Sequence, residues 1–527
     1  MESRGLSWIL IALVASLVLS DCRRGEEPSF REISIARLRD KIEGGWAGQM
    51  IGVSFGAPTE FRYLERTIPR GDLPEWTDES IRNALDQDDL YVEMTFARVL
   101  DEKGLDATTE DFGNMFKESR YRLWHANLAA RRALRRGVSA VQSGTPRYNA
   151  HANDIDFQIE SDFIGLMSPG LPQAATDLSL RVGRVMNSGD GILGGVFVNG
   201  MYAAAFFESD PRRVVEAGLA SLPPASPYAR VIRDVLQWAR EDPTHWRKAW
   251  RLVEEKWNGA EACPAGALRP FNIDAKLNGA YIALGLLYGG GDLSRTLEIS
   301  TRCGQDSDCN PSNAAGIVGV MVGYKAIPER WKRGIEPIAD ERFAYTDFSF
   351  RSISESTEKR AIALVERHGG RRQGDTLLIP TQKPVPPELR LWNDFGSPME
   401  RVGTDDPRWS WTGPWTVVKA GKQWWQRDRR AAAAKGAEAT VTFQGTGAIV
   451  VGPYLPDGGR VDVYLDGHLE RSTDVYSDEE EGKGTEDIWH RFGLEEGQHT
   501  VRLVVQGEPF SDSRGSTVAI EDLVVFR

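Results

Sequence analysis

The hydrophobic period of this chain changes at a proline-rich stretch near residue 380, and this change limits the fold to a helical part followed by a β part. Before the stretch, apolar residues recur every three or four positions, for example at Tyr228, Val231, Val235 and Trp238, which is the spacing of an amphipathic helix. After it, segments such as ATVTF, GRVDVYLDG and HTVRLVV alternate apolar and polar residues between turns. Such alternation is typical of the strands of an antiparallel β-sandwich.

These patterns divide the chain into four parts. We predict an export segment over residues 1–24, an all-α domain over 30–372, a proline-rich linker over 373–391 and an antiparallel β-sandwich over 392–527. A chain of 527 residues has enough material for two or three domains. Within the sandwich, the sequence Leu-Asp-Gly-His at residues 465–468 predicts a tight hairpin turn.

The first residues predict export from the cytoplasm. Arg4 precedes a mostly apolar stretch from Leu6 to Leu19, which is shorter than the roughly 20 residues of a membrane-spanning helix. The sequence Leu-Ser-Asp-Cys that ends at Cys22 resembles a bacterial lipoprotein cleavage site, although Asp21 stands where a small residue is expected. We expect a periplasmic or cell-surface protein that is lipid-anchored at Cys22; the alternative is an uncleaved N-terminal anchor.

Charge and cysteine content exclude several classes of protein. The formal net charge of −12 argues against nucleic-acid binding through a basic surface, and we expect contact with a membrane only through the N-terminal anchor. Cys263, Cys303 and Cys309 are too few for a disulfide scaffold. Cys303 and Cys309 are expected either to form one bridge or to stay reduced. Because no histidine or second cysteine pair lies at ligand spacing, we expect no zinc site.

Two acidic clusters open predicted helices far apart in the chain. Asp88 and Asp89 lie in the sequence DQDDL, and Asp306 and Asp308 lie in CGQDSDCNPSNAAG. Each aspartate could simply cap its helix. Two acidic helix starts can also hold a hard divalent cation between helices, and oxygen ligands suit Mg²⁺, Mn²⁺ or Ca²⁺.

Several motifs, taken in order, resemble those of the ADP-ribosylglycohydrolase family. GGWAGQMIGVSFGAPTEF, over residues 44–61, is similar to the opening helix and loop of that family. Asp88 and Asp89 match its Thr-Asp-Asp-Thr motif, and CGQDSDCNPSNAAG matches its Gly-x-Asp-Thr-Asp-Thr motif before a helix of small residues. The resemblance covers roughly Ile33 to Trp331.

This resemblance implies an all-α bundle with one or two Mg²⁺ ions at the bottom of a cleft, with Mn²⁺ or Ca²⁺ as alternatives. The implied metal ligands are Asp88, Asp89, Asp306, Ser307 and Asp308. Glu60 matches the acidic residue of the family's first loop, so Glu60 and Asp89 are the implied catalytic residues. A cation pair can bind sugar hydroxyls and orient a water, and a nearby carboxylate can act as general acid or base.

The chain also departs from the family pattern. Gln87, Leu90 and Cys309 stand where the family has threonines, and Val53 stands where it often has an aspartate, so the number of ions stays open. The segment NDIDFQIESDF, over residues 153–163, lacks the usual Asn-Gly-x-x-Met-Arg pattern. The predicted substrate-binding residues are Asp156, Glu160, Asp162 and Asn310. Added acids disfavour a pyrophosphate and fit a neutral sugar better.

Together these features predict an exported divalent-metal-dependent glycoside hydrolase. We expect it to cleave an O- or N-glycosidic bond of a carbohydrate or glycoside, with a furanoside-type sugar favoured. One alternative is a true ADP-ribosyl hydrolase, and another is a non-catalytic surface protein that binds glycans. The tryptophans that could contact glycan in the sandwich region are Trp392, Trp409, Trp411, Trp415, Trp424 and Trp425, but each is more readily explained as part of the core.

Overall fold

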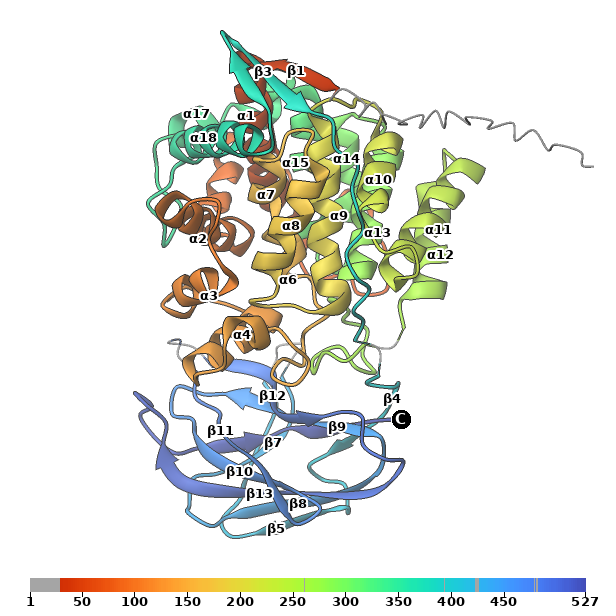
Figure 1. Cartoon of the computed structure of the whole chain (residues 1–527). Helices are drawn as coiled ribbons and strands as arrows, with labels where there is room; N and C mark the ends of the chain where they lie inside the picture. Colours follow the sequence, from red (N-terminus) through yellow and green to blue (C-terminus); the bar gives the residue numbers. More distant parts are fainter. Residues whose placement is uncertain (1–28, 260, 393, 422–425, 478, 480–481) are drawn as a thin grey trace, which may run out of the picture.

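A bundle of helices lies against one end of a β-sandwich in the computed structural model (Figure 1). The structure describes residues 29–527 except 260, 393, 422–425, 478 and 480–481. The export segment with Cys22, and Trp424 and Trp425, therefore lie outside the described residues. Within the described part, helices long and apolar enough to cross a membrane are absent. The predicted order of an all-α part followed by antiparallel sheets is confirmed.

Helices α1 (Ile35–Gly56) and α15 (Cys309–Val322) pack closely in the middle of the bundle. Glycines at every fourth position of α1 permit this approach: a Cβ atom on Gly48 would lie 2.2 Å from the carbonyl oxygen of Ala315, and one on Gly52 would lie 2.2 Å from that of Pro311. A Cβ on Gly56 would lie 2.0 Å from the Ser307 carbonyl oxygen. The glycine row therefore brings the end of α1 against the second acidic loop.

The other helices surround this pair. They are α2 (Asp88–Lys103), α3 (Thr109–Lys117), α4 (His125–Arg135), α5 (Ala140–Ser143), α6 (Asp156–Ile159), α7 (Asp162–Leu166), α8 (Pro172–Gly183), α9 (Gly189–Ala205), α10 (Pro211–Ala220), α11 (Pro227–Glu241), α12 (Trp246–Trp257), α13 (Ala275–Gly289), α14 (Leu293–Arg302), α16 (Glu329–Lys332), α17 (Ile335–Ile338) and α18 (Phe350–Arg367). Short 3-10 segments are η1 (Ala57–Thr59), η2 (Arg70–Asp72), η3 (Asp78–Asp86) and η4 (Tyr324–Ala326).

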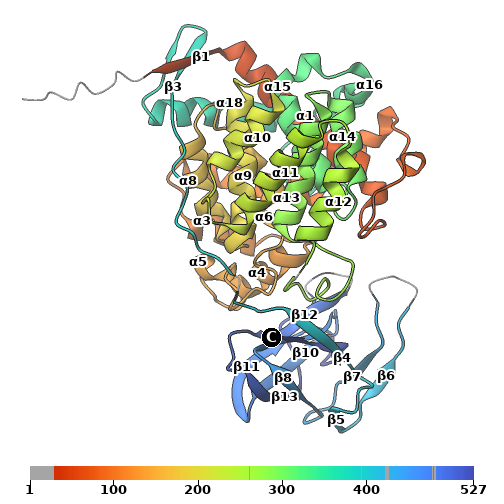
Figure 2. The same ribbon diagram turned by 90° about the vertical axis from the view of Figure 1, so that its right-hand side faces the viewer.

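A small antiparallel sheet lies at the end of the bundle away from the sandwich. It contains β1 (Phe30–Ser34), β3 (Thr376–Pro380) and β2 (Arg371–Gln373) in the order β1-β3-β2. Strand β3 thus occupies part of the segment that the sequence assigned to a linker. Its residues Leu377 and Ile379 are fully buried, and this burial favours a strand. The chain then runs along the bundle to the sandwich (Figure 2).

The sandwich contains a sheet in the order β11-β10-β13-β8-β5, a sheet in the order β12-β9-β15-β4 and a smaller sheet β14-β7-β6. The strands are β4 (Pro398–Gly403), β5 (Trp409–Thr412), β6 (Thr416–Val418), β7 (Arg429–Ala432), β8 (Glu438–Gly445), β9 (Gly447–Tyr454), β10 (Gly459–Leu465), β11 (His468–Asp474), β12 (Lys483–Arg491), β13 (Gly497–Pro509), β14 (Val518–Ile520) and β15 (Asp522–Phe526). Asp466 and Gly467, with φ of 50° and 84°, form the predicted hairpin turn between β10 and β11.

The tryptophans that the structure describes in this region fill and cover the sandwich. Trp392 and Trp409 are each 6% exposed. Trp411 stacks on Trp409 with ring centroids 5.0 Å apart, and Trp415 meets Trp411 at 4.9 Å. These contacts match the interpretation of the tryptophans as core residues.

Candidate functional site

An acidic cleft of about 620 Å³ lies where the loops at one end of the bundle meet strand β12 of the sandwich. Its acidic wall residues are Glu60, Asp86, Asp88, Asp156, Glu160, Asp306, Asp308 and Glu486. Arg122 and Lys483 carry the permanent positive charges of the wall, and Phe61, Trp124 and Phe271 are among its aromatic side chains. The cleft is therefore strongly negative, with apolar surfaces beside the carboxylates.

The loop between α14 and α15 supplies the tightest acidic group. Asp306, Asp308 and Cys309 each offer a ligand atom, and these atoms lie within 4.8 Å of one another. The loop turns at Gly304, with φ of 80°, where a Cβ atom would lie 2.5 Å from the Tyr63 carbonyl oxygen. The adjacent Gln305 amide donates to that same carbonyl at 3.0 Å. Backbone contacts thus fix the second acidic loop against the first.

Asp88 and Asp89 form the first turn of α2 and approach the same loop. The Cys309 thiol donates to Asp89 Oδ2 at 3.2 Å, while Asp89 Oδ1 is buried without a hydrogen-bond partner among the described residues. Burial, then the charges of Asp88 and Asp308, raises the pKa of Asp89 well above its ordinary value. Burial also raises the pKa of Asp306 to about 7. This crowding of carboxylates, one with an unpaired oxygen, fits a divalent cation.

Glu60 lies beside these aspartates, just after η1 at the end of α1. Its side chain is open to the solvent of the cleft. The packing around its carboxyl group, followed by the charges of Asp308 and Asp88, raises the pKa of Glu60 well above the ordinary value. The side chain can therefore hold a proton at a pH at which an ordinary glutamate has lost it.

Asp156 and Glu160 form another acidic part of the wall and are held by α4. The Asn127 amide donates to Asp156 Oδ1 at 2.8 Å, and Asn127 Nδ2 donates to Glu160 Oε1 at 2.6 Å. Burial raises the pKa of Asp156 to about 7 and that of Glu160 well above its ordinary value. Both can bind a hydroxyl group of a ligand.

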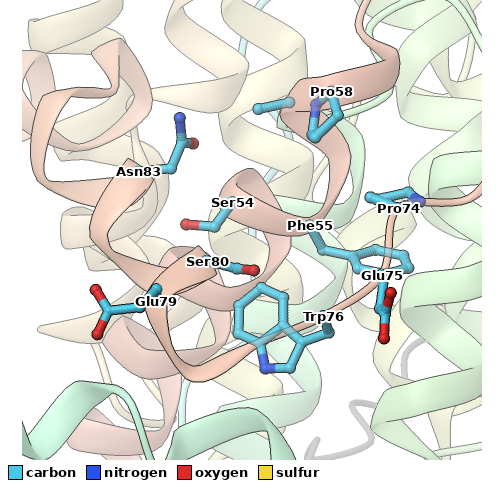
Figure 3. Close-up of a pocket in the computed structure, with 10 residues that line it drawn as sticks. Ser54, Phe55, Pro58, Pro74, Glu75, Trp76, Glu79, Ser80 and Asn83 are labelled. Carbon is cyan, nitrogen blue, oxygen red and sulfur yellow. The ribbon is translucent and has the colours of Figure 1, made fainter.

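A second cavity, of about 430 Å³, lies between the end of α1 and residues 74–83 (Figure 3). Trp76 and Phe55 line it, and the carboxylates of Glu75 and Glu79 lie on opposite sides of the Trp76 ring. Because these carboxylates do not converge on one point, the acidic cleft is the better candidate site.

The family model for ADP-ribosylglycohydrolase matches residues 34–365, which is more than half of the chain. The chain belongs to the ADP-ribosylglycohydrolase family. This is a family of metal-dependent hydrolases, and the resemblance found in the sequence is confirmed.

The other similar proteins match a smaller part of the chain or share little sequence identity with it. The A type blood alpha-D-galactosamine galactosaminidase of Flavonifractor plautii is 42% identical over 69 residues, which are 13% of this chain and 6% of that protein. The chain thus spans a small fraction of the length of this relative. A solved structure titled ADP-ribosylglycohydrolase-related protein complex is 17% identical, with a TM-score of 0.37, over 62% of this chain and 99% of that one. The CBM36-1 domain of a xylanase from the hindgut metagenome of Trinervitermes trinervoides is 14% identical, with a TM-score of 0.17, over 24% of this chain and 94% of that domain.

Within this ADP-ribosylglycohydrolase fold, the structure does not bring every predicted residue to the cleft wall. The Ser307 hydroxyl lies 2.9 Å from that of Thr59 and is fully buried. Asp162 accepts a hydrogen bond from Asn313 Nδ2 at 2.7 Å inside the bundle. Asn310 donates to Asn278 Oδ1 at 2.9 Å. Ser307 is thus turned away from its predicted ligand position, and Asp162 and Asn310 from the predicted substrate surface.

Part of the wall of the acidic cleft could not be predicted from the sequence. Trp124 and His125 belong to none of the motifs found in the sequence, yet both line the cleft. Lys483 reaches over from the sandwich, and its Nζ atom lies 4.0 Å from the centre of the Trp124 ring. No local spacing signals this contact, because it depends on the docking of two domains. The sequence did not decide whether Cys303 and Cys309 form a disulfide bridge. In the structure both are free thiols.

Proposed function

We propose that this chain is an exported, divalent-metal-dependent hydrolase that cleaves an O- or N-glycosidic bond, with a furanoside-type sugar as the favoured substrate. The observation that carries the proposal is the convergence of Glu60, Asp88, Asp306 and Asp308 on one cleft of a metal-dependent hydrolase fold. The cleft is large enough for one or two sugar units with the scissile bond beside these carboxylates.

The cation would be held by Asp88, Asp306 and Asp308 at the cleft surface, with Asp89 beneath them. Carboxylate oxygens suit Mg²⁺, Mn²⁺ and Ca²⁺ alike, and we favour Mg²⁺, as one or two ions, on the resemblance to the family. When bound there, a divalent cation would supply Lewis-acid chemistry toward sugar hydroxyl groups and water. The carboxylates hold it in place at the cleft floor.

Glu60 is the proposed general acid. Burial, the largest cause of its raised pKa, favours a proton on the carboxyl group, which can pass to the oxygen or nitrogen of the leaving group when the glycosidic bond breaks. Asp89, our second predicted catalytic residue, is 0% exposed and, unlike Glu160, does not line the cleft. We therefore assign it the task of positioning the cleft floor through its contact with Cys309.

Asp156 and Glu160 are the proposed contacts for sugar hydroxyls, and Trp124, Phe61 and Phe271 supply apolar faces on which a sugar ring can stack. The negative wall repels a pyrophosphate and accepts a neutral sugar. This charge balance favours a neutral glycoside over ADP-ribose. The galactosaminidase relative from Flavonifractor plautii is consistent with a glycoside substrate, although the match covers only 13% of this chain.

A true ADP-ribosyl hydrolase is the second candidate, since the family includes that activity in its name. Arg122 and Lys483 on the wall are the groups that could meet a pyrophosphate. The replacement of a family threonine by Cys309 supports a third candidate, a glycan-binding protein without turnover.

A panel of aryl furanosides and pyranosides, tested beside an ADP-ribosylated peptide with and without EDTA, distinguishes the three candidates. We expect release from one class of sugar that EDTA abolishes and Mg²⁺ or Mn²⁺ restores. Cleavage of the peptide alone would support the ADP-ribosyl hydrolase. Glycan binding without turnover on any substrate would support the binding protein.

Export is a separate part of the proposal and is supported by residues 1–24 alone. In a bacterial host, we expect the chain in the membrane fraction and labelled by a fatty acid. A Cys22→Ala variant should lose the label. Equal labelling of both proteins would contradict lipid attachment at Cys22.

A further inference from the structure

Four side chains of different kinds converge beside the acidic cleft. His125, His151, Asp154 and Cys263 each offer one ligand atom, and these atoms all lie within 4.8 Å of one another. They come from the first residue of α4, from the turns before α6 and from the loop between α12 and α13. This is the end of the bundle that faces the sandwich, and Figure 1 shows α4 directly above β12.

We propose that these four residues bind a zinc ion. Two imidazoles, one thiolate and one carboxylate are ligands that Zn²⁺ prefers, whereas Mg²⁺ and Ca²⁺ prefer oxygen alone. Zinc–ligand distances of about 2.0–2.3 Å place the ligand atoms of a tetrahedral site about 3.3–3.8 Å apart, which is within the 4.8 Å that separates these atoms at most. Four protein ligands complete a tetrahedron, so the site is structural. It does not depend on the function proposed above.

The charge state of the cluster suits a cation. Burial, then the neighbouring His151 and Lys483, lowers the pKa of His125 well below its ordinary value, so its imidazole is neutral and keeps a lone pair. Burial, then the charges of Asp156 and Asp274, raises the pKa of Asp154 well above its ordinary value. A bound cation would relieve this accumulation of buried negative charge.

The orientation of the His151 ring also favours a metal ion at this cluster. Its ring is 1% exposed, and its Nδ1 atom faces the cluster, 2.7 Å from Asp154 Oδ2. Its Nε2 atom is buried without a hydrogen-bond partner among the described residues and lies 3.7 Å from Glu486 Oε2. A carboxylate behind an imidazole is the arrangement that orients metal-binding histidines. Here that carboxylate comes from β12 of the sandwich.

His125 has a strained backbone that holds it at the cluster. Its φ of 44° is in the left-handed region, which residues other than glycine adopt uncommonly. The imidazole stacks on Phe271 with ring centroids 5.6 Å apart. Because His125 also lines the cleft, a zinc ion here would fix one wall of the proposed active site and connect it to the sandwich.

A catalytic role for the thiol fits less well. Cys263 is 1% exposed, and burial followed by the charges of Asp154 and Glu261 raises its pKa well above the ordinary value. Such a thiol is a poor nucleophile for a substrate in the cleft. Sequence spacing predicted no zinc site because these ligands come from separated segments that only the fold brings together.

The test uses the purified full chain and measures metal directly. We expect one equivalent of zinc per chain by mass spectrometry after gel filtration. After removal of zinc with a chelator, titration with Co²⁺ should give the intense visible bands of a tetrahedral site and a thiolate-to-cobalt charge-transfer band. Absence of both zinc and the charge-transfer band in the wild-type protein would overturn the proposal, and would indicate a hydrogen-bonded cluster without metal.

Matched variants assign the ligands. Cys263→Ser should remove the charge-transfer band, whereas Cys303→Ser, at another buried thiol of the bundle, should keep it. Glu486→Gln should weaken zinc binding by about ten- to a hundredfold, because it removes the carboxylate behind His151. Asp306→Asn should keep full zinc content, which separates this site from the cleft floor. Equal zinc content in the Cys263 and Cys303 variants would overturn the assignment.

Discussion

Arg132 of α4 donates hydrogen bonds to the backbone carbonyl oxygen and to Oδ1 of Asp474, both at 2.9 Å, across the boundary between bundle and sandwich. The two side chains are 7% and 3% exposed. The guanidinium also lies 3.7 Å from the centre of the Tyr454 ring, and Arg136 donates to Asp474 Oδ2 at 2.6 Å. These contacts hold the sandwich so that β12 forms part of the cleft wall.

Removal of Arg132 should weaken the whole protein. In Arg132→Ala, Asp474 stays buried with Arg136 as its remaining charged partner among the described residues, and we expect a loss of about 3 kcal/mol in the free energy of unfolding. Urea unfolding followed by tryptophan fluorescence measures this loss. Arg98→Ala, whose ion-pair partners Glu102 and Asp347 both belong to the bundle, should cost less than about 1 kcal/mol. Equal losses would contradict the role of the interface pair.

The contribution of Asp474 to the free energy of unfolding should also depend on pH. Burial raises the pKa of this carboxylate, but Arg132 and Arg136 outweigh burial, so the folded pKa lies below the ordinary value. The stability that it contributes is therefore fully present above the unfolded pKa of about 4 and is lost as pH falls through the lower folded pKa. The difference in stability between the wild type and Arg132→Ala should narrow between pH 5 and about pH 3. A constant difference would argue against this charge pair.

Divalent cations should stabilise the protein through the cleft floor, more strongly at high pH. The pKa of Asp306 is about 7 because of burial, so protons compete with the cation below that pH. We expect Mg²⁺ to raise the melting temperature at pH 8 and to raise it less at pH 6. Asp306→Asn should lose this shift and the activity, while Asp375→Asn, whose side chain is 99% exposed, should keep both. An unchanged shift in Asp306→Asn would place the cation elsewhere.

The motifs in order were sufficient to predict the fold, and they placed Asp88, Asp306 and Asp308 on one wall. Spacing could not give side-chain direction. Asp306 and Asp308 face the cleft, so the intervening Ser307 faces Thr59 instead. The contacts between the helical bundle and the β-sandwich could not be predicted from the sequence either, because they depend on how the two domains pack together.

Strand β3 shows another limit of sequence patterns. Leu377 and Ile379 precede the prolines of the linker directly, and only the pairing of β3 with β1 and its burial against the bundle reveal a strand there. Its partner strand, residues 30–34, is adjacent in space but far away in the sequence, at the start of the helical domain.

Glu60→Gln should separate binding from proton transfer. As the proposed general acid, Glu60 works in its protonated form, and activity should fall as pH rises through its raised pKa. The amide cannot give up a proton, so kcat should fall about 10²- to 10⁴-fold and the alkaline limb of the pH profile should disappear. Glu79→Gln in the second cavity (Figure 3) is the matched control and should leave the profile unchanged. A retained alkaline limb in Glu60→Gln would assign that limb to another group.

Trp124 should determine sugar affinity rather than the rate of bond cleavage. Its ring is 39% exposed and lines the cleft, with Lys483 Nζ over one face. Loss of stacking in Trp124→Ala should cost about 1.4 kcal/mol, which is a tenfold rise in KM, with kcat little changed. Trp124→Phe should recover most of the affinity because it restores an aromatic face. Trp415→Ala in the sandwich should leave KM unchanged, since Trp415 packs on Trp411 away from the cleft lining. A rise in KM from Trp415→Ala instead would show that the sandwich itself binds the glycan.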